Sequence, residues 1–91
     1  MRFQFLSFFL LGSRSVADFD RITQQPGMMG GKPCIRGMRV TVGMIVGQLG
    51  AGRTIDELLA DYPYIEREDI FQSLRYASRL AEERHIELGN D

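Results

Sequence analysis

Apolar residues recur with a helical period in the middle of the chain. One stripe at the i, i+3, i+4 and i+7 positions consists of Val42, Ile45, Val46 and Leu49. Thr41 precedes the stripe, and its hydroxyl can accept a hydrogen bond from a free amide of the first turn. We therefore predict a helix over residues 42–50, ended by Gly50-Ala51-Gly52. Gly43 and Gly47 lie one turn apart on its other side, where they weaken the helix but permit close approach of another backbone.

A second helix is predicted over residues 54–61. Thr54 and Glu57 have the spacing of a capping box, in which each side chain bonds the other residue's amide. The residues that would face the core are Ile55, Leu58 and Leu59. Tyr62-Pro63 ends the helix, because the residue before a proline avoids the helical conformation.

A third helix is predicted from Arg67 to about residue 86. Its apolar face would consist of Ile70, Leu74, Ala77 and Ala81, with Phe71 and Leu80 at the flanks. Its solvent stripe would consist of Glu68, Gln72, Arg75, Arg79 and Glu82. The tight proline turn between the second and third helices has the spacing of a helix-turn-helix.

A short β-hairpin is predicted before the helices. Gly37-Met38 lies between Cys34-Ile35-Arg36 and Arg39-Val40-Thr41, which is typical of a two-residue type II′ turn. Arg21-Ile22-Thr23 is also compatible with a strand, whereas residues 12–21 read as connective and residues 24–31 as a loop. The predicted fold is mainly α: a three-helix helix-turn-helix bundle preceded by a short β-hairpin.

Residues 1–18 form an apolar tail outside this pattern, residues 19–88 one domain, and residues 89–91 a short C-terminal tail. The tail has three readings. Translation begins later and the tail is a mis-assigned start, or it packs on the domain or a partner, or it is a secretion signal ending near Ser15-Val16-Ala17. We favour the first reading and a cytoplasmic location. The apolar run is too short to span a membrane.

Charge is divided unevenly between the halves of the chain. Residues 1–52 carry six Arg or Lys and two Asp, and residues 53–91 carry five Arg and ten Asp or Glu. The basic half can face an anionic partner, or it can lie against the acidic half of the same chain. Lone Cys34 is expected to be a buried apolar residue, and no Cys and His spacing indicates a metal. No catalytic constellation is legible, so we expect no enzyme, no cofactor and no metal.

An ordered series of motifs resembles a small prokaryotic family, domain-of-unknown-function family 433. It runs through Asp20–Thr23, Met29–Gly37, Arg39–Val42, Ala51-Gly52, Ile55–Leu59, Asp61–Pro63 and Glu68–Ile70. The resemblance covers about residues 19–84 and departs from the family at Met38, where Thr or Leu is usual. It implies a homeodomain-like helix-turn-helix fold and an antitoxin that represses its own operon and neutralises a PIN-like ribonuclease.

Two sets of residues are candidates for these contacts. The candidates for DNA are Lys32, Arg36 and Arg39 on the ribbon and Gln72, Arg75 and Arg79 on the third helix. The candidates for the toxin are Leu80, Arg84, Ile86 and Leu88. The acidic start of the third helix opposes docking of its first turn to phosphate. The charged face of this helix can therefore be a solvated surface without a partner. Arg36 and Arg39 can likewise pair with the acidic residues of this helix instead of DNA. The expected partners are operator DNA, the toxin and a second copy in a homodimer. The alternative is a protein-interaction module of the same fold without DNA binding.

Overall fold

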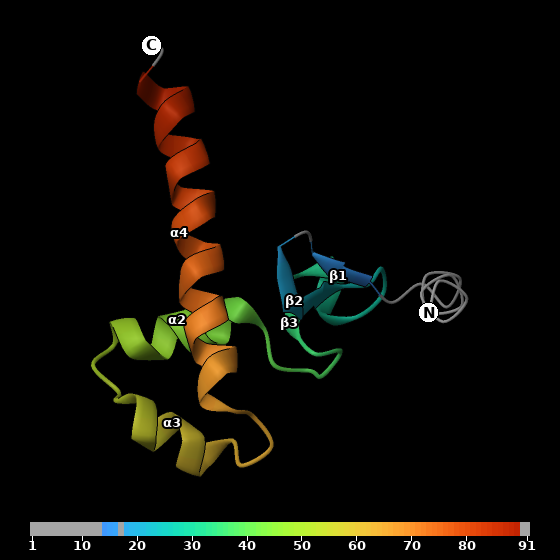
Figure 1. Cartoon of the computed structure of the whole chain (residues 1–91), viewed down its shortest axis with the longest axis vertical. Coiled ribbons are helices and arrows are strands. Elements are labelled where there is room, and N and C mark those ends of the chain that lie inside the picture. Colours follow the sequence, from blue (N-terminus) through green and yellow to red (C-terminus); the bar gives the residue numbers. More distant parts are fainter. Residues whose placement is uncertain (1–13, 17, 90–91) are drawn as a thin grey trace.

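Three strands and three α-helices make up the computed structural model, which describes residues 14–16 and 18–89, and the side chains of residue 16 and residues 18–83. The strands β1 (Arg14–Val16), β2 (Phe19–Gln24) and β3 (Cys34–Ile35) form an antiparallel sheet in the order β1-β2-β3. The helices are α2 (Val42–Gly50), α3 (Ile55–Asp61) and α4 (Arg67–Gly89). Figure 1 shows the sheet on one side of α4, with α2 crossing α4 and α3 below it. The predicted hairpin followed by three helices is confirmed.

β1 and the start of β2 lie where the sequence indicated only a connection. Cross-strand pairs join Ser15 to Thr23 and Arg14 to Gln24. Pairing with β2, more than strand propensity, makes this short segment extended, which is why its sequence gave little sign of it. The rest of the expected tail, residues 1–13 and 17, lies outside the described residues.

The turn of the predicted hairpin is displaced by one residue. The Met38 amide donates to the Ile35 carbonyl at 2.8 Å, so Arg36 and Gly37 are the central residues of the turn. Their φ angles are 45° and 75°. Positive φ at both central positions defines a type I′ turn, so the predicted type II′ turn at Gly37-Met38 is wrong. Beyond the turn, a single bridge pairs Cys34 with Thr41.

Both predicted helix starts are confirmed. The Thr41 hydroxyl accepts a hydrogen bond from the Met44 amide at 3.0 Å, and the Thr54 hydroxyl accepts one from the Glu57 amide at 3.1 Å. The Glu57 carboxylate accepts the Thr54 amide in return, and that bond holds the pKa of Glu57 below its usual value. These caps satisfy amides that a helix start leaves free, and so fix where α2 and α3 begin.

The buried face of α4 differs from the predicted one. Its buried residues are Asp69, Ile70, Gln72, Ser73 and Tyr76. Leu74 and Ala81, expected in the core, are exposed. The buried face of α4 includes polar residues because they have hydrogen-bond partners elsewhere in the domain. The period of the apolar residues alone cannot predict those partners. Ile70 joins a core that also contains Phe19, Ile22, Ile35, Val40, Val42, Ile45, Leu58, Ile65 and Tyr76.

Thr23 provides a test of the turn at Arg36-Gly37. Its hydroxyl accepts the Gly37 amide at 2.9 Å, and the residue is 7% exposed. Thr23→Val keeps the shape but leaves that amide without a partner, so we expect the free energy of unfolding to fall by about 1–3 kcal/mol in urea titrations. Thr23→Ser retains the hydroxyl and is the control. A valine variant as stable as the wild type would contradict the hydrogen bond.

Candidate functional site

The carboxylate of Asp69 joins the start of α4 to the sheet and the turn. Asp69 is the third residue of α4 and is fully buried, with 0% of its surface exposed. One of its oxygens accepts Arg21 Nη1 at 2.9 Å and Arg36 Nε at 3.1 Å. The other accepts Arg36 Nη2 at 2.8 Å and the Glu66 amide at 2.7 Å. The carboxylate therefore caps its own helix while it binds two arginines from the basic half of the chain.

The environment of Asp69 favours its charged form. Burial by itself raises the pKa of a carboxyl, but the hydrogen bonds from Arg36, the Glu66 amide and Arg21 outweigh it and lower the pKa of Asp69. The bonds to Asp69 raise the pKa of Arg36. The pKa of Arg21 is raised chiefly by a further hydrogen bond that its Nη1 donates to the Glu66 carboxylate at 2.6 Å, and then by the bond to Asp69. This cluster is thus charged throughout the physiological pH range and acts as a structural joint.

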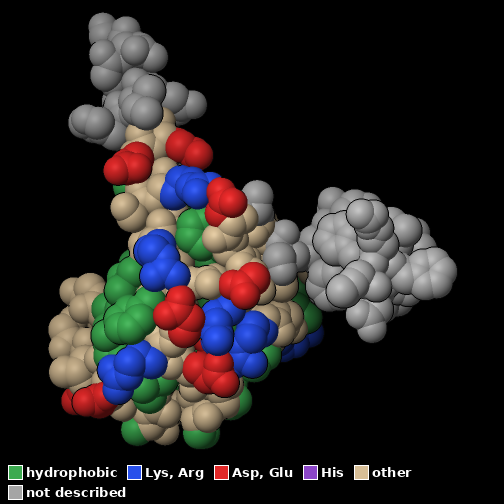
Figure 2. Space-filling model, in the orientation of Figure 1, with side chains coloured by type: hydrophobic (Ala, Val, Ile, Leu, Met, Phe, Trp, Pro, Cys, Tyr) green, Lys and Arg blue, Asp and Glu red, His purple; other side chains and the backbone are tan. Residues whose placement is uncertain are grey.

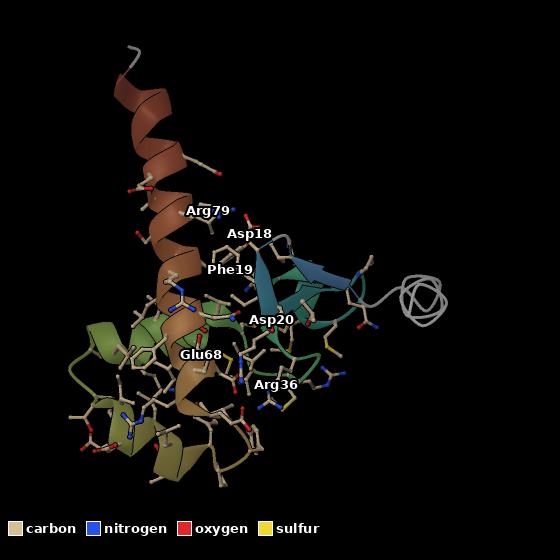
Figure 3. All side chains as sticks on the ribbon, in the orientation of Figure 1. Asp18, Phe19, Asp20, Arg36, Glu68 and Arg79 are labelled. Atoms are coloured by element: carbon tan, nitrogen blue, oxygen red, sulfur yellow. The ribbon has the colours of Figure 1, made fainter. Side chains whose placement is uncertain are left out.

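Arg36 is held in an unfavourable backbone conformation by this joint. A residue other than glycine loses about 1 kcal/mol or more of conformational free energy when its φ is positive. The guanidinium offsets that cost with a two-pronged bond to Asp69 and a further bond to the Tyr64 carbonyl at 2.9 Å. The alternative that Arg36 pairs with the acidic helix is therefore confirmed, and its donors are directed into the domain (Figure 3).

Gln72 is not on the solvent face where the sequence placed it. It is 7% exposed, its side-chain oxygen accepts the Arg21 amide at 3.1 Å, and its side-chain nitrogen donates to Asp20 at 2.7 Å. Both ends of the amide group are thus bonded to β2. Because β2 packs against this side of α4, Gln72 links strand to helix, and the expectation that it is free to contact a base is wrong.

Arg75 and Arg79 are exposed, as predicted, but each has an acidic neighbour. Arg75 pairs with Glu68 at 2.8 Å, and Arg79 pairs with Asp18 at 3.1 Å while lying over the Phe19 ring. Figure 3 shows Arg79, Asp18 and Phe19 close together where β2 meets α4. Both arginines line a shallow hollow of about 390 Å³ that Glu82 also lines. Figure 2 accordingly shows positive and negative side chains interspersed on this face.

The remaining predicted cations, Lys32 and Arg39, form no ion pair within the described part of the chain. Both are exposed. Arg39 follows the turn, with a guanidinium nitrogen 3.7 Å from Met29 Sδ. Lys32 lies instead at the rim of an apolar groove between α2 and α4. Neighbouring Cys34 is buried as expected, and burial raises the pKa of its thiol.

Apolar side chains are exposed on two sides of α4. Phe71 and Leu74, each 38% exposed, lie one turn apart. Leu80, 46% exposed, lines the groove shared with α2. Arg84, Ile86 and Leu88 belong to the helical part of the chain, but their side chains lie outside the described residues.

No group of three or more His, Cys, Asp or Glu among the described residues is placed to hold a metal ion. None of the helices in this part of the chain is long and apolar enough to cross a membrane.

The sequence pattern of a family described as "Protein of unknown function (DUF433)" matches residues 22–77. The chain belongs to this family. The matched segment contains Arg36, Asp69 and Gln72, so most of the joint between sheet and helix lies within it, whereas Leu80 lies beyond it.

This DUF433 chain is similar to two further proteins. "Uncharacterized protein y4eO" of Sinorhizobium fredii is 32% identical over 56 residues, which are 62% of this chain and 25% of that protein. The chain therefore spans a quarter of the curated relative it matches. The crystal structure of a DUF433 member protein from Anabaena variabilis superposes with a TM-score of 0.69 and 27% identity, over 97% of this chain and 81% of that one.

Sequence reasoning gave the pairing of Arg36 with the acids of α4 only as an alternative, and it missed Arg21 and Asp69 as members of this cluster, because they are far apart in the chain. Arg21 and Asp69, for example, are 48 residues apart. One signal was present, since a carboxylate at the third position of a predicted helix can reach back to cap it. That signal marks Asp69 as a helix cap but does not identify its arginine partners.

The stability of the domain should depend on the charge of Asp69. The pKa of Asp69 is lowered in the folded state. Its contribution to the free energy of unfolding is therefore fully present above the pKa of the unfolded state, about 3.9, and is lost as the pH falls through the pKa of the folded state. Asp69→Asn should reduce the free energy of unfolding at pH 7 by about 3–5 kcal/mol, because two arginines lose their buried partner. The difference from wild type should narrow below about pH 4.

Thermal unfolding followed by circular dichroism across this pH range measures both effects. Asp56→Asn is the matched control, because Asp56 is exposed and pairs only with exposed Arg67 in the described structure. Equal losses in the two variants would contradict a special role for Asp69.

Proposed function

We propose that this protein acts by binding other macromolecules, as the antitoxin of a type II toxin–antitoxin pair that neutralises a PIN-like ribonuclease. The choice of a PIN-like ribonuclease as partner comes from the resemblance of the sequence motifs to the DUF433 family. The observation that carries the proposal is the exposed apolar surface on the outer side of α4. In this proposal the chain has no catalytic role, and its chemistry is that of a docking surface.

The outer surface of α4 is centred on Phe71 and Leu74. They lie three residues apart, so their side chains are neighbours on the helix. Figure 2 shows hydrophobic side chains beside charged ones along the lower half of α4. The Arg75–Glu68 ion pair lies on the same helix and supplies the charges. Exposed aromatic and aliphatic anchors bordered by charges are the usual anatomy of a protein interface.

The C-terminal end of α4 supports the same proposal. The helix continues to Gly89 and so carries the predicted toxin contacts Leu80, Arg84, Ile86 and Leu88 on one continuous element. The segment also contains Glu82, Glu83 and Glu87. A nuclease groove that attracts RNA phosphate through basic residues would attract these carboxylates as well.

Replacing both outer anchors tests the proposal. Phe71→Glu combined with Leu74→Glu should abolish protection in cells that co-express a PIN-like nuclease which the wild-type chain neutralises, because two charges would be buried in the interface. The readout is growth after toxin induction. Tyr64→Glu adds a charge at an aromatic residue that is 53% exposed and outside α4, and should still protect. Full protection by a folded Phe71/Leu74 variant would contradict this docking surface.

DNA binding with repression of the operon is a second candidate function. The observation that favours it is Arg39, an exposed cation shortly before α2 that has no acidic partner among the described residues. The acidic first turn of α4 and the bonds of Gln72 and Arg36 oppose base contact through α4. The contact we propose is therefore to phosphate, through Arg39, and it carries little sequence information.

Arg39→Ala should weaken binding to every duplex, and should reduce the slope of log affinity against log salt by about one. Fluorescence anisotropy with the DNA upstream of the gene, over a series of salt concentrations, measures this slope. Arg67→Ala is the control, since Arg67 pairs with Asp56 at 2.7 Å. A wild-type chain without affinity for DNA at low salt would leave the protein-interaction module as the function.

A further inference from the structure

A groove between α2 and α4 has no occupant within the described chain. Its volume is about 700 Å³, and its walls are mainly apolar. The lining residues include Gly43, Met44, Val46 and Gly47 of α2, Tyr76, Ala77 and Leu80 of α4, and Lys32 and Pro33 before β3. Leu80 on this groove and Phe71 lie on opposite sides of α4, because they are nine residues apart, which is about 180° around a helix.

The glycines on the groove are not needed by the fold of the described chain. A Cβ at Gly47 would meet nothing within 4 Å, and one at Gly43 would come no closer than 3.8 Å to the Thr41 hydroxyl. Neither glycine has a positive φ. Alanine at each position would therefore favour the helix by about 1 kcal/mol. Their absent side chains leave the wall of the groove low enough for another helix to approach closely.

The C-terminal half of α4 extends beyond the rest of the domain (Figure 1). Residues 78–83 are all exposed, and the helix continues to Gly89. Helical turns of this length are marginal in water without packing against another surface. Leu80 is both a wall of the groove and part of this extension, so the open groove and the unpacked helix form one continuous surface.

We propose that a second copy of the chain fills the groove, with the two α4 helices antiparallel across a two-fold axis near Leu80. A two-fold interface uses the same surface of both copies, so each contact occurs twice. With Leu80 at the axis, Glu83 of one copy lies opposite Ala77 of the other, because each is three residues from the axis. Each copy then provides the groove for the other copy's extended helix.

Charge complementarity selects this occupant. Ala77 and Lys32 line the same groove, so Glu83 of one copy comes to the rim that Lys32 of the other occupies. Neither Lys32 nor Glu83 forms an ion pair within the described part of a single chain. In this dimer Lys32 of each copy therefore pairs with Glu83 of the other, so that two ion pairs form between groups that are solvated in a single copy.

Sedimentation equilibrium of the full chain, with no other protein present, tests the arrangement. We expect a reversible dimer whose dissociation constant rises by roughly thirtyfold or more in Leu80→Glu, as for a central interface anchor. Phe71→Glu is the matched control, with a similarly exposed side chain on the opposite side of α4, and it should dimerise as the wild type does. Circular dichroism of both variants confirms that the fold is retained.

Charge reversal tests the register. Lys32→Glu and Glu83→Lys should each weaken the dimer by roughly tenfold, and the double variant should return to within about threefold of the wild type. A wild-type chain that is monomeric at all concentrations would overturn the proposal in favour of another occupant. So would equal effects of Leu80→Glu and Phe71→Glu, or a double variant as weak as the single ones. None of these outcomes depends on a toxin or on DNA.

Discussion

The buried carboxylate of Asp69 is the interaction on which the arrangement of this domain depends. It accepts four hydrogen bonds, two from Arg36, one from Arg21 and one from the amide that begins α4. A buried carboxylate is costly unless its oxygens are bonded and its charge is matched. Each donor belongs to a different element or connection, so satisfying Asp69 fixes the sheet, the turn and the helix start relative to one another.

This joint also determines which charges remain for other partners. The basic half of the chain gives the impression of a cationic surface, yet Arg21 and Arg36 are directed into the acidic start of α4. A charge that is bonded inside the domain contributes little to the attraction of phosphate. Among the cations of the basic half whose side chains the structure describes, Lys32 and Arg39 are therefore the two without an acidic partner. They lie in different places, Lys32 at the groove and Arg39 just after the turn.

Different sides and different halves of helix α4 have different contacts. Its first half bonds β2 through Gln72 and packs Tyr76 edge-on against Phe19, with ring centroids 5.4 Å apart. Its outer side exposes Phe71 and Leu74, and its extended half carries Leu80 beside the groove. Because positions half a turn apart face opposite ways, a partner bound at Phe71 and a second copy bound at Leu80 would contact different side chains of this helix.

The sequence alone determined the three helices, the caps of α2 and α3 and the presence of a turn before them, because these depend on local periodicity and on hydrogen bonds within a few residues. The family, too, could be identified from its ordered motifs. Only the tertiary structure decided that Gln72 is buried, that Arg36 is bonded to Asp69 and that Leu74 is exposed. Those outcomes depend on partners 33–52 residues away in the chain, and a helical period cannot indicate which polar residue will find such a partner.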